Sequence, residues 1–199
     1  MHKVFISYHH ANDQGYKEAL IQFNSGHRIF IDGSVDTREI SDTLTDEQIR
    51  IAIRDYYLAD STVTIVLVGT ATKNRKHVDW EIYSSMRDGA LNKKSGILVV
   101  TLPTISSTYF TAAHEQEKSI VYPDVTSWTS ITERSVYEQR YPHLPARIID
   151  NLLAPKAKVS VAPWERLTVQ RLSTLIECAY EDRASCEYDL SRPMRRTDS

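Results

Sequence analysis

Ser61-Thr-Val-Thr-Ile-Val-Leu-Val-Gly69 is the stretch of sequence that decides the fold. Its nearly continuous run of β-branched and apolar residues is typical of a strand buried on both faces of a parallel sheet. Seven polar or small residues follow, and from Val78 to Ala90 apolar residues recur every four positions, which predicts a helix with Trp80-Glu81 in its first turn.

Two more strands are predicted before this stretch. Lys3-Val-Phe-Ile-Ser7 is a run of β-formers, and Arg28-Ile-Phe-Ile-Asp32 is another. Between them an apolar stripe from Tyr16 to Phe23 predicts a helix. Because strand, helix and strand follow one another within residues 3–32, they indicate a βαβ unit and a parallel sheet.

The alternation continues along the chain. Thr45 and Gln48 form a capping box that opens a helix, and Gly96–Leu102 is predicted to be a strand stopped by Pro103. Residues 104–143 have no sustained period and are interpreted as long loops with short elements. One such short element is Ser119–Tyr122. Beyond residue 143 we expect a helix over Ala146–Leu153, an edge strand over Val159–Val161, and a final helix whose apolar stripe runs from Trp164 to Ala179.

Composition limits the class of protein. The 199 residues have a formal net charge of -2, are 41% hydrophobic and 25% charged, and show no charge excess of the kind that binds nucleic acid. No apolar run approaches the roughly 20 residues that span a bilayer, and Met1 leads directly into a strand, so we expect no signal peptide, no membrane contact and a cytoplasmic protein.

Several kinds of site are absent from the sequence. The six glycines form neither phosphate-binding motif, which argues against a Rossmann dehydrogenase or a P-loop NTPase. No G-x-S-x-G, H-E-x-x-H or zinc-type spacing occurs, so we expect no metal. Cys178 and Cys186 are not spaced as metal ligands, and we expect them to be reduced and assign them no role.

Glu81 is the candidate functional carboxylate. It follows a central strand at the sheet edge where α/β proteins bind ligands. Lys73-Asn-Arg-Lys-His77 places three cations before the helix, where cationic charge is disfavoured, and they could hold the phosphates of a nucleotide. The alternatives are a glutamate that only complements the helix dipole and a solvated basic loop.

Three stretches together resemble a Toll/interleukin-1 receptor (TIR) domain: Val4-Phe-Ile-Ser-Tyr8, Phe30-Ile-Asp32 and the helix that carries Trp80-Glu81. The chain is most similar to the bacterial TIR-like group that includes the NAD-consuming subunit of the Thoeris antiphage system. The resemblance covers about residues 3–102 and implies a flavodoxin-like, TIR-type α/β fold, with an open, mainly parallel sheet and helices on both faces.

We expect a single TIR-like domain over residues 1–187, with its family motifs in residues 3–102 and a divergent half in residues 103–187. Residues 188–199 are polar and arginine-rich, so we expect a disordered tail. Contact with nucleic acid through its arginines is an alternative that composition favours little, and we expect none.

The resemblance implies that Glu81 is the catalytic residue of an NAD glycohydrolase or cyclase, with NAD as substrate and no cofactor. Glu81 would bind the ribose hydroxyls and stabilise positive charge on the sugar, and nicotinamide leaves as a neutral molecule without a general acid. One departure concerns the tryptophan that the family commonly has four residues earlier, where this chain has His77. Trp80 cannot replace it, because successive helical residues point about 100° apart.

We expect the substrate to be contacted by Phe5, Ser7, Tyr8, His9, His10, Asp36, Lys73, Arg75, His77 and Trp80. The alternative for Tyr8 is packing in the core, and the alternative for the two histidines is a solvated loop. The polar stretch Gly33–Leu44, which contains Asp36, is a candidate lid over the site.

The product would be an ADP-ribose-type signal, cyclic by preference, that a separate effector protein reads in antiphage defence, and the family resemblance implies self-association. Two alternatives stay open. One is a non-catalytic TIR-like interaction module that uses the loop at residues 33–44. The other is a flavodoxin-like receiver or nucleotide-binding domain, although Ser7-Tyr8 does not supply the paired acidic residues that a receiver needs.

Overall fold

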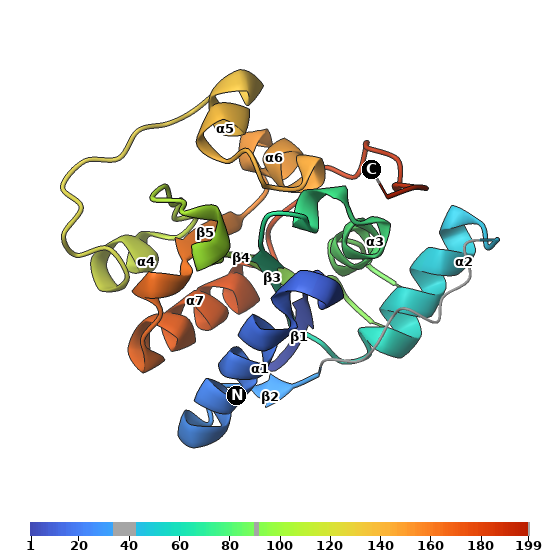
Figure 1. The fold of residues 1–199 in the computed structure, drawn as a ribbon, viewed down its shortest axis with the longest axis horizontal. Helices are drawn as coiled ribbons and strands as arrows, with labels where there is room; N and C mark the ends of the chain where they lie inside the picture. The colour runs from blue at the N-terminus through green and yellow to red at the C-terminus, as the bar shows by residue number, and fades with distance from the viewer. Residues whose placement is uncertain (34–42, 90–91, 199) are drawn as a thin grey trace.

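The computed structural model describes residues 1–33, 43–89 and 92–198, and it confirms the predicted α/β fold (Figure 1). One parallel five-stranded sheet has the order β2-β1-β3-β4-β5. Its strands are β1 (Lys3–Ser7), β2 (Ile31–Asp32), β3 (Val63–Val68), β4 (Gly96–Thr101) and β5 (Val159–Pro163).

Helices cover both faces of the sheet (Figure 1). The described helices are α1 (His10–His27), α2 (Asp46–Ile51), the π-helix η1 (Ala52–Tyr57), η2 (Thr72–Asn74), α3 (Lys76–Ser85), η3 (Pro103–Ile105), α4 (Glu115–Ile120), α5 (Arg134–Arg140), α6 (Ala146–Leu153), η4 (Trp164–Arg166) and α7 (Val169–Asp182).

Strand β3 explains why the central stretch is apolar throughout. All six of its residues are buried. Ile65 and Leu67 pack in the cluster beneath α1 and α7, whereas Val66 and Val68 pack in the cluster beneath α3 and α6. Because successive side chains of a strand point to opposite faces, a strand covered on both sides requires an unbroken apolar run.

Several boundaries differ from the sequence predictions. Strand β2 begins at Ile31 because Arg28 adopts a left-handed conformation (φ 52°) that ends α1. Helix α3 ends at Ser85, and Ala90 lies outside the described residues. Helix α7 begins after its cap, Thr168, so the predicted stripe from Trp164 crosses a separate 3-10 turn.

Residues 104–143 contain more helix than their aperiodic sequence predicts, because α4 and α5 both lie there. The capping box of Thr45 and Gln48, the helix over Ala146–Leu153 and the edge position of β5 are confirmed. Across the part of the chain that the structure describes, no helix is both long and apolar enough to span a membrane.

The segment at residues 188–198 differs most from its prediction. It packs along α3 and α6 instead of projecting as a disordered tail (Figure 1). Met194 is buried beside Phe5 and Trp80, and the backbone carbonyls of Arg192 and Pro193 accept hydrogen bonds from Arg147. The charged side chain of Arg147 supplies an anchor that local composition does not reveal.

Candidate functional site

A crevice opens where the chain leaves neighbouring strands β1 and β3 in opposite directions. Strand β1 leads into α1 on one face of the sheet, and β3 leads into α3 on the other. In the strand order 2-1-3-4-5, this is the switch point where ligands bind. A cavity of about 620 Å³ lies there, lined by Tyr8, His9, His10, Ala11, Gln14, Arg75, His77, Val78 and Asp198. Its volume suits a small-molecule ligand.

Several predicted site residues meet in this cavity. Tyr8, His9 and His10 enter it from the end of β1, and Arg75 and His77 enter from the start of α3. The Tyr8 hydroxyl donates a 2.5 Å hydrogen bond to Oε1 of Gln14, and the Tyr8 ring lies 4.2 Å from that of His10. One wall of the cavity is therefore aromatic, and its side chains are held in place by contacts with one another.

Glu81 is joined to β1 by a short hydrogen bond. The Ser7 hydroxyl donates to its Oε2 at 2.6 Å, and both side chains are buried, with Glu81 only 3% exposed. Since α3 begins at Lys76, Glu81 lies in the second helical turn. Helix-dipole effects fall off within the first turn, so the dipole explanation for this glutamate is weakened.

Glu81 does not itself line the cavity. It lies one helical turn after His77, and residues four apart share a helix face. The carboxylate is therefore close to the cavity but is not exposed in it.

Phe5 and Trp80 lie in the hydrophobic core. Both belong to a buried cluster with Ile49, Ile53, Leu58 and Met194. The indole N–H of Trp80 donates to the carbonyl of Arg195 at 2.7 Å, and its ring meets the ring of His77 edge-on at 4.8 Å. His77, and not Trp80, is thus the aromatic residue of α3 that faces the cavity.

The basic loop is divided between two places. Lys73 donates to the carbonyl of Pro142 at 2.6 Å and lines a separate hollow of about 250 Å³. Arg75 borders both hollows and pairs with Asp198 at 3.2 Å. Arg75 is therefore the loop cation placed to meet a ligand in the larger cavity. Asp36 lies outside the described residues.

Asp13 is a buried carboxyl group that the sequence did not single out. It lies in the first turn of α1, where Thr72 Oγ1 donates to it at 3.3 Å. A Cβ atom at position 69 would come within 2.5 Å of the Asp13 carboxylate, so Gly69 permits this close approach. Burial raises the pKa of Asp13, while the bond from Thr72 and the charge of His9 oppose the rise. Acidic residues are common in the first turns of helices, so no signal in the sequence distinguished Asp13 from them.

Gln14 and Asp198 were also missed. Gln14 is a polar residue of the kind usually found on the surface, so its sequence context did not indicate a site. Asp198 lies more than a hundred residues along the chain from the other residues of the cavity. Burial lowers the pKa of His9 and the charge of Arg75 lowers it further, while Asp13 and Asp198 act against this. Within residues 1–33, 43–89 and 92–198, no three His, Cys, Asp or Glu side chains gather to hold a metal ion.

A family model described as Thoeris protein ThsB, TIR-like domain, matches residues 5–107, which are 103 of the 199 residues. The chain belongs to the Thoeris ThsB family of TIR-like domains. Membership supports a TIR-type role in antiphage defence, together with other Thoeris components. No curated protein matches the chain. The matched range of this TIR-like domain contains both walls of the cavity except Asp198.

Proposed function

We propose that this TIR-like domain cleaves the bond between nicotinamide and ribose in NAD. The observation that carries the proposal is the carboxylate of Glu81, held by Ser7 next to a cavity at the switch point of the sheet. Membership of the TIR-like family is compatible with NAD-cleaving activity. The burial of the Glu81 carboxylate favours such a role, because a carboxylate stabilises developing positive charge more strongly where water is excluded.

In this reaction the bond from C1′ to the nicotinamide nitrogen breaks, and its electron pair stays on the neutral nicotinamide. Positive charge develops on the ribose, where the Glu81 carboxylate stabilises it. A nucleophilic oxygen or nitrogen then forms the new bond to C1′, and one proton is released. Water gives ADP-ribose, whereas an oxygen or nitrogen of the same nucleotide gives a cyclic product, which requires a cavity that excludes water. We propose the cyclic product, as a signal that a separate effector protein reads.

The test measures nicotinamide release from NAD by the purified protein, alone and in a stimulated or assembled state. Glu81→Gln should abolish release while it leaves the fold intact. Glu115→Gln is the matched control, because Glu115 is an exposed helix glutamate remote from the cavity. Release at the wild-type rate by folded Glu81→Gln would refute the proposal.

A second candidate function is that of an interaction module that makes no product. The low exposure of Glu81 favours it, since a substrate does not reach the carboxylate in the described arrangement. Activation of the effector by the Glu81→Gln protein itself would support this function.

A further inference from the structure

Helix α3 begins with an unusual cap. Its N-cap residue is Arg75, which makes no capping hydrogen bond with its side chain. The N–H of Lys76 instead donates to Oδ1 of Asp198 at 2.8 Å, and Arg75 donates to Oδ2 at 3.2 Å. Helix starts are usually capped by a local Ser, Thr, Asp or Asn, whereas this carboxylate arrives from 122 residues further along the chain.

The carboxylate of Asp198 occupies a position, at the N-terminus of α3 and beside Arg75, that is suited to a phosphate group. A helix N-terminus offers unpaired N–H groups to an anion, and an arginine beside it adds charge-assisted hydrogen bonds. Asp198 lines the same cavity as His9 and His77. Burial opposes its charged form, yet the hydrogen bonds from Lys76 and Arg75 and their charges outweigh burial and lower the pKa of Asp198.

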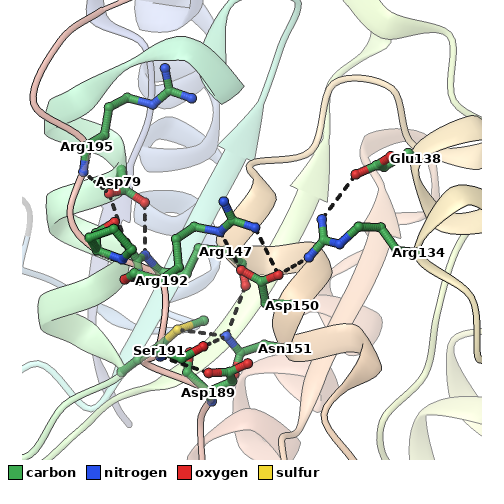
Figure 2. A network of polar contacts seen from close by, with 12 residues as sticks. Asp79, Arg134, Glu138, Arg147, Asp150, Asn151, Asp189, Ser191, Arg192 and Arg195 are labelled. Carbon is green, nitrogen blue, oxygen red and sulfur yellow. Dashed lines mark hydrogen bonds and ion pairs between the residues drawn. The ribbon is translucent and has the colours of Figure 1, made fainter.

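The segment that delivers Asp198 is anchored beside Glu81. Figure 2 shows Asp79 between Arg147 and the backbone N–H of Arg195. The Arg147 side chain is fully buried and bridges Asp79 through two nitrogens, at 2.9 and 3.0 Å. With the bond from Trp80 to the Arg195 carbonyl, two residues of α3 that immediately precede Glu81 hold the segment.

The contact of Asp198 is much less buried than this anchor. The Asp198 side chain is 42% exposed and that of Arg75 is 35% exposed. Exposed ion pairs contribute little to stability, so this contact can open while residues up to Arg195 remain docked.

We propose that residues 196–198 make an autoinhibitory contact, in which Asp198 occupies the position that the pyrophosphate of a dinucleotide takes. The inference rests on the proposed function for the identity of that dinucleotide. Asp198 leaves before the ligand binds, and Arg75 exchanges one anionic partner for the other. The segment thereby keeps the free enzyme in a closed, weakly active state.

The first test is the binding of inorganic pyrophosphate, measured by calorimetry. Asp198→Asn removes the charge but keeps a capping oxygen, so the fold should survive and affinity should rise by about fivefold or more, the usual lower range of coupling between sites. Glu187→Gln is the matched control, because Glu187 immediately precedes the segment and lies in an exposed pair with Lys156. It should bind as the wild type does. Equal affinity of Asp198→Asn and the wild type would overturn the proposal.

A double variant localises the effect. Arg75→Ala combined with Asp198→Asn should lose the gain in pyrophosphate affinity. If the gain persists, the anion binds elsewhere and the proposal is wrong.

A second readout follows the segment itself. Trypsin can cleave after Arg196, and this cleavage should be faster in Asp198→Asn than in Glu187→Gln. Pyrophosphate should accelerate cleavage of the wild type, and a rate that pyrophosphate leaves unchanged would contradict displacement.

Nicotinamide release separates this proposal from the proposed function. If Asp198→Asn binds pyrophosphate more tightly but no variant releases nicotinamide, the inhibitory contact stands and the proposed reaction fails. If nicotinamide is released and Asp198→Asn changes neither its rate nor pyrophosphate affinity, the reaction stands and the contact fails.

Discussion

Ser7 at the end of β1 donates a 2.6 Å hydrogen bond to Glu81 of α3, and this bond joins the two motifs that the family resemblance identified separately. Ser7 is completely buried. A hydroxyl in that position both satisfies one oxygen of the carboxylate and fixes its direction. In the proposed function Ser7 is therefore a positioning residue for Glu81, since it does not line the cavity that would hold the substrate.

Replacing Ser7 by Ala should lower kcat for NAD cleavage and leave KM nearly unchanged. The reason is that a misdirected carboxylate loses transition-state stabilisation more than substrate binding. Loss of a hydrogen bond to a buried acceptor should also destabilise the fold by about 1–3 kcal/mol, measured by urea denaturation.

Ser84→Ala is the matched control for this prediction. Ser84 is a fully buried serine of α3 whose hydroxyl has no hydrogen-bond partner among the described residues. Its removal should leave kcat unchanged. If Ser7→Ala and Ser84→Ala behave alike, Ser7 does not position the carboxylate.

Arg75 and Lys73 should affect substrate binding differently. Arg75 lines the larger cavity, whereas Lys73 is bonded to the Pro142 carbonyl beside another hollow. In the Asp198→Asn background, where the inhibitory contact is already weakened, Arg75→Ala should raise KM for NAD several-fold and weaken its salt dependence. Lys73→Ala should do neither. Equal effects of the two would restore the hypothesis that the whole loop binds phosphate.

The sequence predicted those parts of the fold whose signals are local. An unbroken apolar run marked β3, and the Thr45 and Gln48 side chains marked a helix start. The packing of residues 188–198 had no such signal, because it depends on Arg147 and Asp79, which come from two distant helices. An arginine-rich stretch has the same composition whether it is solvated or docked on a buried partner.

In the candidate site, too, the sequence predicted some features, whereas others depend on distant residues. Strand order brought Tyr8 and His77 to one edge, as expected from the carboxyl ends of neighbouring parallel strands. The sequence did not predict that Trp80 faces the core, since a helix position alone does not say which neighbours cover it. Nor did it predict that Asp198 enters the cavity, which depends on the docking of the whole segment.

Arg147→Met should be strongly destabilising. It leaves Asp79 as a buried carboxylate without its bidentate partner, and breaking a buried pair typically costs about 3–5 kcal/mol. Urea denaturation should show this loss, and trypsin should cut after Arg195 more readily. Lys156→Met, which opens an exposed pair with Glu187, should change stability little. A small effect of Arg147→Met would mean that the segment is held by Met194 and not by this ion pair.

His9 should titrate below its ordinary pKa of 6.5. As pH falls below that value, the unfolded chain binds a proton at this residue before the folded protein does, so His9 lowers the stability of the fold progressively until the folded-state pKa is reached. Arg75→Gln should raise the pKa of His9, because Arg75 acts with burial to lower it, and Asp198→Asn should lower it further. NMR titration of the imidazole measures both shifts. Shifts of the opposite sign would contradict the arrangement of these charges.

The signal should be a small molecule that survives removal of the protein. Protein-free filtrate from the activated enzyme and NAD should switch on the cognate effector, and filtrate from the Glu81→Gln reaction should not. The wild-type and Glu81→Gln proteins present the same surface, because the substitution keeps the size of the side chain and removes only its charge. An effector that responds to contact with the protein would therefore respond equally to both. Asp198→Asn should produce active filtrate faster than Glu187→Gln does, because its cavity is open to the pyrophosphate of the substrate. If the effector responds only when the protein itself is present, and responds equally to Glu81→Gln, then the domain acts as an interaction module and not as a source of a nucleotide.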